Sequence, residues 1–130
     1  KNPFLTDISY YNSRKLDLDT MNNACKCLFN YNDFTSFSKV NTETKTNNCV
    51  IKKAQWKMEE ESIVFEITAN RFLRNMVRAI VGTMIEVGLG KVTIDQFKKI
   101  IENKDRGEAG TSVPGHALFL TNVSYPYIKD

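Results

Sequence analysis

The sequence has few of the residues that define disulfide-rich, zinc-binding or membrane-spanning proteins. Its 130 residues include three cysteines and one histidine, whereas a structural zinc site needs paired C-x-x-C units or more histidines. An odd cysteine count does not fit a disulfide framework, so we expect reduced thiols in a cytoplasmic protein. No apolar run approaches the ~20 residues of a membrane-spanning helix. We also find no internal repeat, and we expect no secretory leader.

The residues that are present suit one globular domain. The chain is 42% hydrophobic and 25% charged, which is too apolar for a disordered tail and sufficient for a single modest core. Lys and Arg number 18 against 15 Asp and Glu, and the net charge of +3 permits nucleic acid as a partner without requiring it. Because the sequence does not start with Met, we expect it to be part of a longer protein.

The hydrophobic pattern predicts an α+β fold, with an antiparallel sheet and helices packed on one of its faces. Residues 1–16 lack clear periodicity and are expected to form an extended lead-in. The first expected helix is capped by Asp17 or Asp19, and its apolar side consists of Met21, Ala24, Cys25, Leu28 and Phe29. A hairpin of strands at 49–56 and 62–69 follows. The last expected elements are helices at 71–88 and from Thr93, and a strand at 117–125. Thr93 and Gln96 form a capping box.

The helix at 71–88 contains the most informative polar residues. Arg71, Arg74 and Arg78 are spaced i, i+3 and i+7 and would share one helical face. The second half of this helix is apolar almost all round, so we expect Arg78 to be largely buried. A buried guanidinium needs an anionic partner, because leaving it unpaired costs about 3–5 kcal/mol. No acid lies three or four positions away, so the partner is a distant residue, another chain or a ligand, unless Arg78 reaches solvent at a helix edge.

Two loops offer further candidates. Phe34 and Phe37 lie in a polar segment and could stack on nucleic-acid bases, although loop aromatics more commonly fill the edge of a core. The glycine-rich loop at 107–115 lacks the G-K-[ST] ending of a phosphate-binding P-loop. No Ser or Cys nucleophile is arranged with His116, which we interpret as an ordinary loop histidine.

Basic residues gather in one part of the chain. Residues 71–106 hold eight Lys or Arg and four Asp or Glu, a balance of +4, so the remainder carries −1. Such a surface is consistent with phosphate contacts and equally with a plain solvated face. On charge and placement, Arg71, Arg74, Lys104 and Arg106 are predicted to contact phosphate groups.

Several ordered blocks closely resemble the tRNA pseudouridine synthase A family. The longest is the segment F-E-I-T-A-N-R-F-L-R-N-M-V-R-A-I-V-G at 65–82. The others, in family order, are Asp33-Phe34-Thr35-Ser36-Phe37, Lys104-Asp105-Arg106, and Ala117-Leu118-Phe119-Leu120 with Val123 and Tyr125-Pro126. Together these blocks extend over nearly the whole chain, which makes the resemblance specific.

The resemblance implies an isomerase that converts uridine to pseudouridine in the tRNA anticodon stem-loop without a metal or organic cofactor. In that family a catalytic aspartate attacks the flipped-out nucleotide and pairs with an arginine, which Arg78 matches by motif. Leu118 matches an apolar residue that packs near the uracil. The family is typically homodimeric, which implies a second copy as partner besides tRNA.

One departure from the family pattern is decisive for the expected role of the chain. The aspartate's G-R-T-D-A-G-like motif and the family's active-site tyrosine are absent, and Ala117 replaces a usual glycine. We therefore expect residues 1–130 to be a single domain, the C-terminal domain of a synthase without its N-terminal catalytic half, inactive alone. The alternatives are a stand-alone, non-catalytic RNA-binding module and a dimerisation domain.

Overall fold

The computed structural model describes residues 2–8, 16–38, 47–59, 62–73, 75–109 and 118–122. Its strands are β1 (Asn2–Ile8), β2 (Ile51–Glu59), β3 (Ser62–Ala69) and β4 (Leu118–Asn122). Its helices are α1 (Leu18–Leu28), α2 (Met76–Gly88) and α3 (Ile94–Asn103), with short 3-10 turns η2 (Thr35–Phe37) and η3 (Arg106–Glu108).

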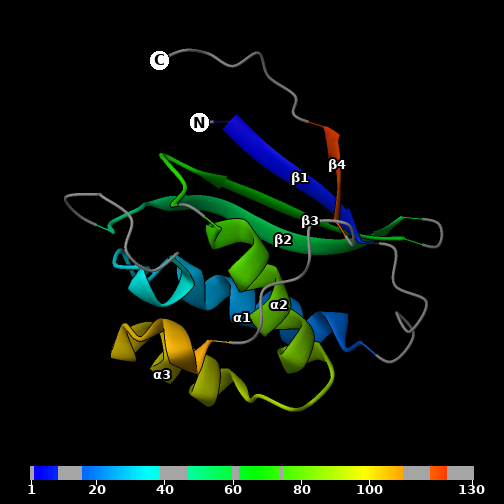
Figure 1. Cartoon of the computed structure of the whole chain (residues 1–130). Coiled ribbons are helices and arrows are strands. Elements are labelled where there is room, and N and C mark those ends of the chain that lie inside the picture. The colour runs from blue at the N-terminus through cyan, green and yellow to red at the C-terminus, as the bar shows by residue number, and fades with distance from the viewer. Residues whose placement is uncertain are drawn as a thin grey trace.

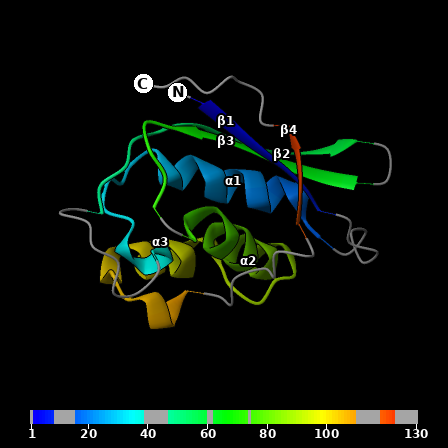
Figure 2. The ribbon, with the colours of Figure 1, turned by 45° about the horizontal axis from the view of Figure 1, so that its top comes forward.

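The four strands form one sheet in the order β2-β3-β1-β4, with antiparallel pairing between all neighbours. The helices gather on one face of this sheet, with α1 beside it and α3 farthest away (Figures 1 and 2). The predicted α+β architecture with helices on one face is therefore confirmed. The predicted hairpin is confirmed as β2 and β3, whose register pairs Trp56 with Phe65.

Strand β1 corrects the prediction that residues 1–16 form an extended lead-in. It lies inside the sheet, between β3 and β4, with Phe4 opposite Ile67 and Ile8 opposite Leu118. Its position comes from partners more than fifty residues away along the chain, which local periodicity does not report. Pairing on both sides makes β1 an internal strand of the sheet.

Helix α1 begins as predicted. The Asp17 carboxylate caps it by accepting a hydrogen bond from the Thr20 amide at 3.1 Å. Met21, Ala24, Cys25 and Leu28 are buried as expected, but Phe29 is 47% exposed because the helix ends before it. The predicted capping box of the last helix, with Thr93 and Gln96, is present at α3.

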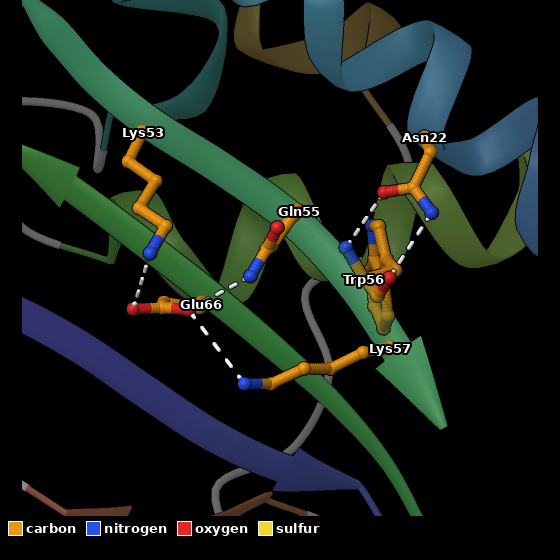
Figure 3. Close-up of polar contacts among 6 residues, drawn as sticks. All are labelled: Asn22, Lys53, Gln55, Trp56, Lys57 and Glu66. Atoms are coloured by element: carbon orange, nitrogen blue, oxygen red, sulfur yellow. Dashed lines mark hydrogen bonds and ion pairs between the residues drawn. The ribbon is translucent and has the colours of Figure 1, made fainter. Parts of the chain in front are cut away.

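Asn22 on α1 joins this helix to β2, the outer strand of the sheet. Its side-chain oxygen accepts from the Trp56 amide at 2.7 Å, and its side-chain nitrogen donates to the Trp56 carbonyl at 3.0 Å (Figure 3). An edge strand has backbone groups with no neighbouring strand to bond. Asn22 bonds both backbone groups of Trp56 at this edge. The Trp56 ring stacks on the Phe65 ring, with a distance of 4.7 Å between the ring centroids.

Candidate functional site

Helix α2 carries Arg78, the arginine that the family resemblance predicts to pair with a catalytic aspartate. Asn75 precedes it in the left-handed conformation with φ of 67°, and the first helical residue is Met76. A left-handed residue cannot continue a right-handed helix, so α2 begins five residues later than predicted. Residues 71–73 are irregular, so the prediction that Arg71 shares a helical face with Arg78 is wrong.

The Arg78 side chain is exposed, which corrects the prediction that it is buried. Most of α2 lies in the core, and its buried residues are Met76, Val77, Ala79, Ile80, Val81, Gly82, Thr83, Met84, Val87 and Gly88. Arg78 lies on the narrow remaining stripe, in line with the half-buried Ile85 and Glu86 at i+7 and i+8. Because Arg78 is exposed, water can solvate its guanidinium. The prediction that Arg78 needs an anionic partner because it is buried therefore does not apply. Within the described ranges, no hydrogen bond or ion pair of Arg78 is found.

The other predicted cations differ in their surroundings. Arg71 is half-buried, and its Nη1 donates to the Asn48 carbonyl at 3.1 Å. Arg106 is half-buried in η3, whereas Lys104 is exposed at the end of α3. Arg74 lies outside the described residues.

Phe34 and Phe37 are completely buried, with no exposed ring surface. Phe37 contacts Phe34 at a centroid distance of 6.5 Å and Phe97 of α3 at 6.2 Å. A ring inside the core cannot stack on a base, so the prediction that these two rings stack on bases is wrong for this structure. The alternative, that they fill the core, is confirmed.

The polar residues of the same segment are also used internally. Asp33 Oδ1 accepts from the amide and the hydroxyl of Thr35 at 3.0 and 2.6 Å. Ser36, fully buried, donates its hydroxyl to the Ile100 carbonyl at 2.6 Å and accepts the Asp105 amide at 2.9 Å. Ser36 is a structural residue that no sequence motif had singled out. The sequence gives one indication of its burial: Ser36 lies between Phe34 and Phe37, and two rings that pack into a core would bury the residue between them.

The turn at Lys104–Arg106, here called the basic turn, includes Asp105, whose amide donates to Ser36. Lys104 caps α3 in the left-handed conformation, with φ of 55° and ψ of 40°. Asp105 then accepts the Gly107 amide at 2.9 Å and so begins η3. The turn therefore has a defined conformation in which two cations flank one carboxylate.

The face of the sheet away from the helices carries a group of polar side chains that no sequence motif had singled out. Glu66 of β3 lies between two lysines of β2, 3.2 Å from Lys53 Nζ and 3.9 Å from Lys57 Nζ, and accepts from Gln55 at 3.0 Å (Figure 3). These β2 residues alternate with Ala54 and Trp56, so they lie on the face away from the helices. The alternation of these polar residues with Ala54 and Trp56 in the sequence already indicates that they share one face of the strand.

Leu118 is the first residue of β4, paired with Ile8 of β1. His116 and Ala117 lie outside the described residues. In the described part of the chain, no three His, Cys, Asp or Glu side chains come together as a metal site. None of the described helices has the length and apolar character to span a membrane.

The three cysteines are free and buried in the structure. Burial raises the pKa of the Cys25 thiol to about 12 and also raises the pKa of Cys49. A thiol that stays protonated at neutral pH is a poor nucleophile and a poor metal ligand. These cysteines are therefore core residues, in agreement with the predicted reduced state.

Comparison with known proteins places these features in a family. The family described as "tRNA pseudouridine synthase" matches residues 24–126. The chain belongs to the tRNA pseudouridine synthase family. It is 60% identical over 126 residues to tRNA pseudouridine synthase A of Parabacteroides distasonis and 57% identical over 127 residues to that of Bacteroides fragilis. It is 38% identical over 122 residues to the Bacillus subtilis protein of the same name.

These matches cover 94–97% of this chain but only 49–50% of each of the three synthases. The chain therefore spans about half the length of the curated relatives it matches. The family match includes the second half of α1 from Ala24, the β2–β3 hairpin, Arg78 and the basic turn. It leaves the activity of a whole synthase to be tested on this chain.

Proposed function

We propose that this chain is the C-terminal half of a tRNA pseudouridine synthase that isomerises uridine in the anticodon stem-loop. The other half would supply the catalytic aspartate, and this half would supply Arg78 to pair with it. Leu118 would pack near the uracil, and Arg71, Arg74, Lys104 and Arg106 would contact RNA phosphates. A tRNA substrate favours the cytoplasm as compartment, and the family resemblance favours a homodimer of the whole enzyme.

The observation that supports this proposal is the position of Arg78. It is an exposed guanidinium in the first turns of a helix that is otherwise almost entirely core. Arginine matches a carboxylate with two parallel hydrogen bonds in fixed geometry, which lysine cannot reproduce. Docking of a second half onto this surface would desolvate the guanidinium and an aspartate together, in a site where the pair is strong.

The arginine would act by holding the nucleophile. A base inside a stem-loop must leave the stack before an enzyme can reach its glycosidic bond. An aspartate that attacks the flipped nucleotide must be ionised and correctly oriented, and a bidentate arginine provides both conditions. In the isomerisation the bond between N1 of the base and C1′ of the sugar breaks and a bond between C5 and C1′ forms. C5 gives up its proton and N1 gains one, so the product has the same composition as the substrate.

A joined synthase tests the proposal. It consists of the part of the Parabacteroides distasonis relative that this chain does not cover, fused ahead of Lys1. Release of tritium from C5 of uridine in an anticodon stem-loop RNA measures turnover. We expect turnover from the joined synthase and none from residues 1–130 alone. Turnover by residues 1–130 alone would contradict the proposal.

Substitution of Arg78 then separates catalysis from binding. We expect Arg78→Ala and Arg78→Lys in the joined synthase to lower turnover by about 30-fold or more, because a desolvated charge pair is worth about 2 kcal/mol or more. RNA affinity should stay within twofold. Lys99→Ala, which removes an exposed cation from α3, is the control and should keep its turnover. If Arg78→Ala instead weakens RNA binding and its salt dependence, the chain is an RNA-binding module.

A further inference from the structure

Ser36 connects two segments that are far apart in the sequence. Its side chain lies in η2, yet its hydroxyl donates to the Ile100 carbonyl of α3 and accepts the amide of Asp105 in the basic turn. It is fully buried, between Phe34 and Phe37, which are also fully buried. A residue packed in this way cannot move without moving the end of α3. The start of the basic turn is therefore tied to the core.

Lys104 occupies a backbone conformation that its own side chain disfavours. The left-handed residue after a helix is usually Gly, because a Cβ is strained at positive φ. Lys104 has φ of 55°, whereas Gly90, after α2, has φ of 82°. A lysine where glycine would fold better indicates that the side chain is useful for something other than folding. Its exposure leaves the ammonium group available to a partner.

We propose that Ser36 is a positioning residue for the basic turn, and that Lys104 is the phosphate contact it places. This inference rests on the proposed function and specifies which part of the chain meets the tRNA backbone. Ser36 sets where α3 ends and Asp105 begins η3, and Lys104 lies between these two fixed points. A flexible cation would lose conformational freedom on binding phosphate, and a turn that is already formed avoids much of that cost.

Lys104→Gly in the joined synthase separates folding from binding at this position. We expect its melting temperature to rise by about 2–4 °C, because glycine relieves the left-handed strain. We expect KM for the anticodon stem-loop RNA to rise about fivefold, and the slope of log affinity against log salt to fall by about one. A purely structural lysine would give the first change without the other two.

A double-mutant cycle tests whether Ser36 acts through Lys104. Ser36→Ala should raise KM about threefold on the Lys104 background and leave it unchanged on the Lys104→Gly background. Thr83→Val is the matched control, because it removes another buried hydroxyl, one that donates to Ala79 within α2. Its effect on KM should be the same, small value on both backgrounds.

The outcomes distinguish this inference from the function on which it rests. An inactive joined synthase with wild-type Ser36 and Lys104 contradicts the proposed function and this inference with it. An active synthase in which Ser36→Ala and Lys104→Gly are additive, or in which Lys104→Gly leaves KM and the salt slope unchanged, overturns this inference alone. Non-additivity with a reduced salt slope supports it.

Discussion

Two segments matched to the same family occupy opposite environments in this molecule. In residues 33–37 both rings and Ser36 are fully buried, and Asp33 and Thr35 are half-buried. Arg78, in the other segment, is exposed on a helix whose remaining faces are core. The comparison shows that a family motif can mark residues that form the fold as well as residues that meet the substrate. Burial and hydrogen bonding distinguish the two kinds.

The largest expected effect on folding tests this comparison directly. Phe37→Ala should lower the free energy of unfolding by about 3–5 kcal/mol, because it leaves a cavity beside Phe97. Arg78→Ala should change it by no more than about 0.5 kcal/mol, as is usual for an exposed residue. Urea unfolding of both variants measures the difference. Equal losses would show that Arg78 belongs to the fold, as Phe37 does.

The two ends of α2 also differ in burial, since Arg78 near its start is exposed and Gly88 at its end is buried. A methyl group at Gly88 would lie 2.5 Å from Met21 Sδ and 3.0 Å from Leu16 Cδ2. Gly88→Ala should therefore cost about 1–3 kcal/mol of stability through overpacking. Ala79→Gly, also buried in α2 and without a clash, is the control for the helix, and should cost about 1 kcal/mol. A neutral Gly88→Ala in thermal unfolding would mean that α1 shifts freely away from α2.

A smaller effect depends on pH. The Tyr31 hydroxyl donates to Glu102 at 2.6 Å, which raises the pKa of Tyr31 to about 12 from its ordinary 10.0. A raised folded pKa means that the bond stabilises the fold below pH 10 and is lost as the pH rises toward 12. Wild-type stability should fall more steeply than that of Tyr31→Phe over this interval. Parallel curves in urea titrations would contradict the bond.

The smallest effect is expected at the acidic cap of α1. The hydrogen bonds from the Thr20 hydroxyl and amide lower the pKa of Asp17 below its usual value of 3.8. A lowered folded pKa means that this contribution is present above pH 4 and is lost as the pH falls. Asp17→Ala should lower the urea midpoint at pH 7 and have less effect at pH 2. Asp19→Ala, in the same turn, is the control for the loss of a carboxylate, because Asp17 is the residue that caps the helix.

Local patterns predicted most of the elements correctly, and the errors have physical causes. The β2–β3 hairpin, the Asp17 cap and the Thr93–Gln96 box depend on near neighbours, which the sequence displays directly. Strand β1 depends on β3 and β4, so its own residues show no clear pattern. The start of α2 depends on a single left-handed residue, Asn75, within a run that otherwise favours helix.

The sequence predicted which residues belong to the candidate site better than it predicted whether their side chains are buried or exposed. The motif selected Arg78 and the basic turn, but the exposure of Arg78 depends on a stripe of α2 that only the tertiary packing defines. Ser36 was missed because its partners, Ile100 and Asp105, lie more than sixty residues away. Phe34 and Phe37 show the reverse, since aromatic residues in a polar loop look available until the core is assembled around them.

The order of the strands has a consequence for how the protein is made. β1 leaves the ribosome first and β4 last among the described strands, yet these two lie side by side in the sheet. Through most of translation, one edge of β1 lacks its partner and remains able to pair with other chains. Closing that edge requires a contact across more than a hundred residues, which makes it a slow, late step of folding. Of the two edges that β1 pairs in the folded sheet, the edge that meets β4 is therefore the last to close.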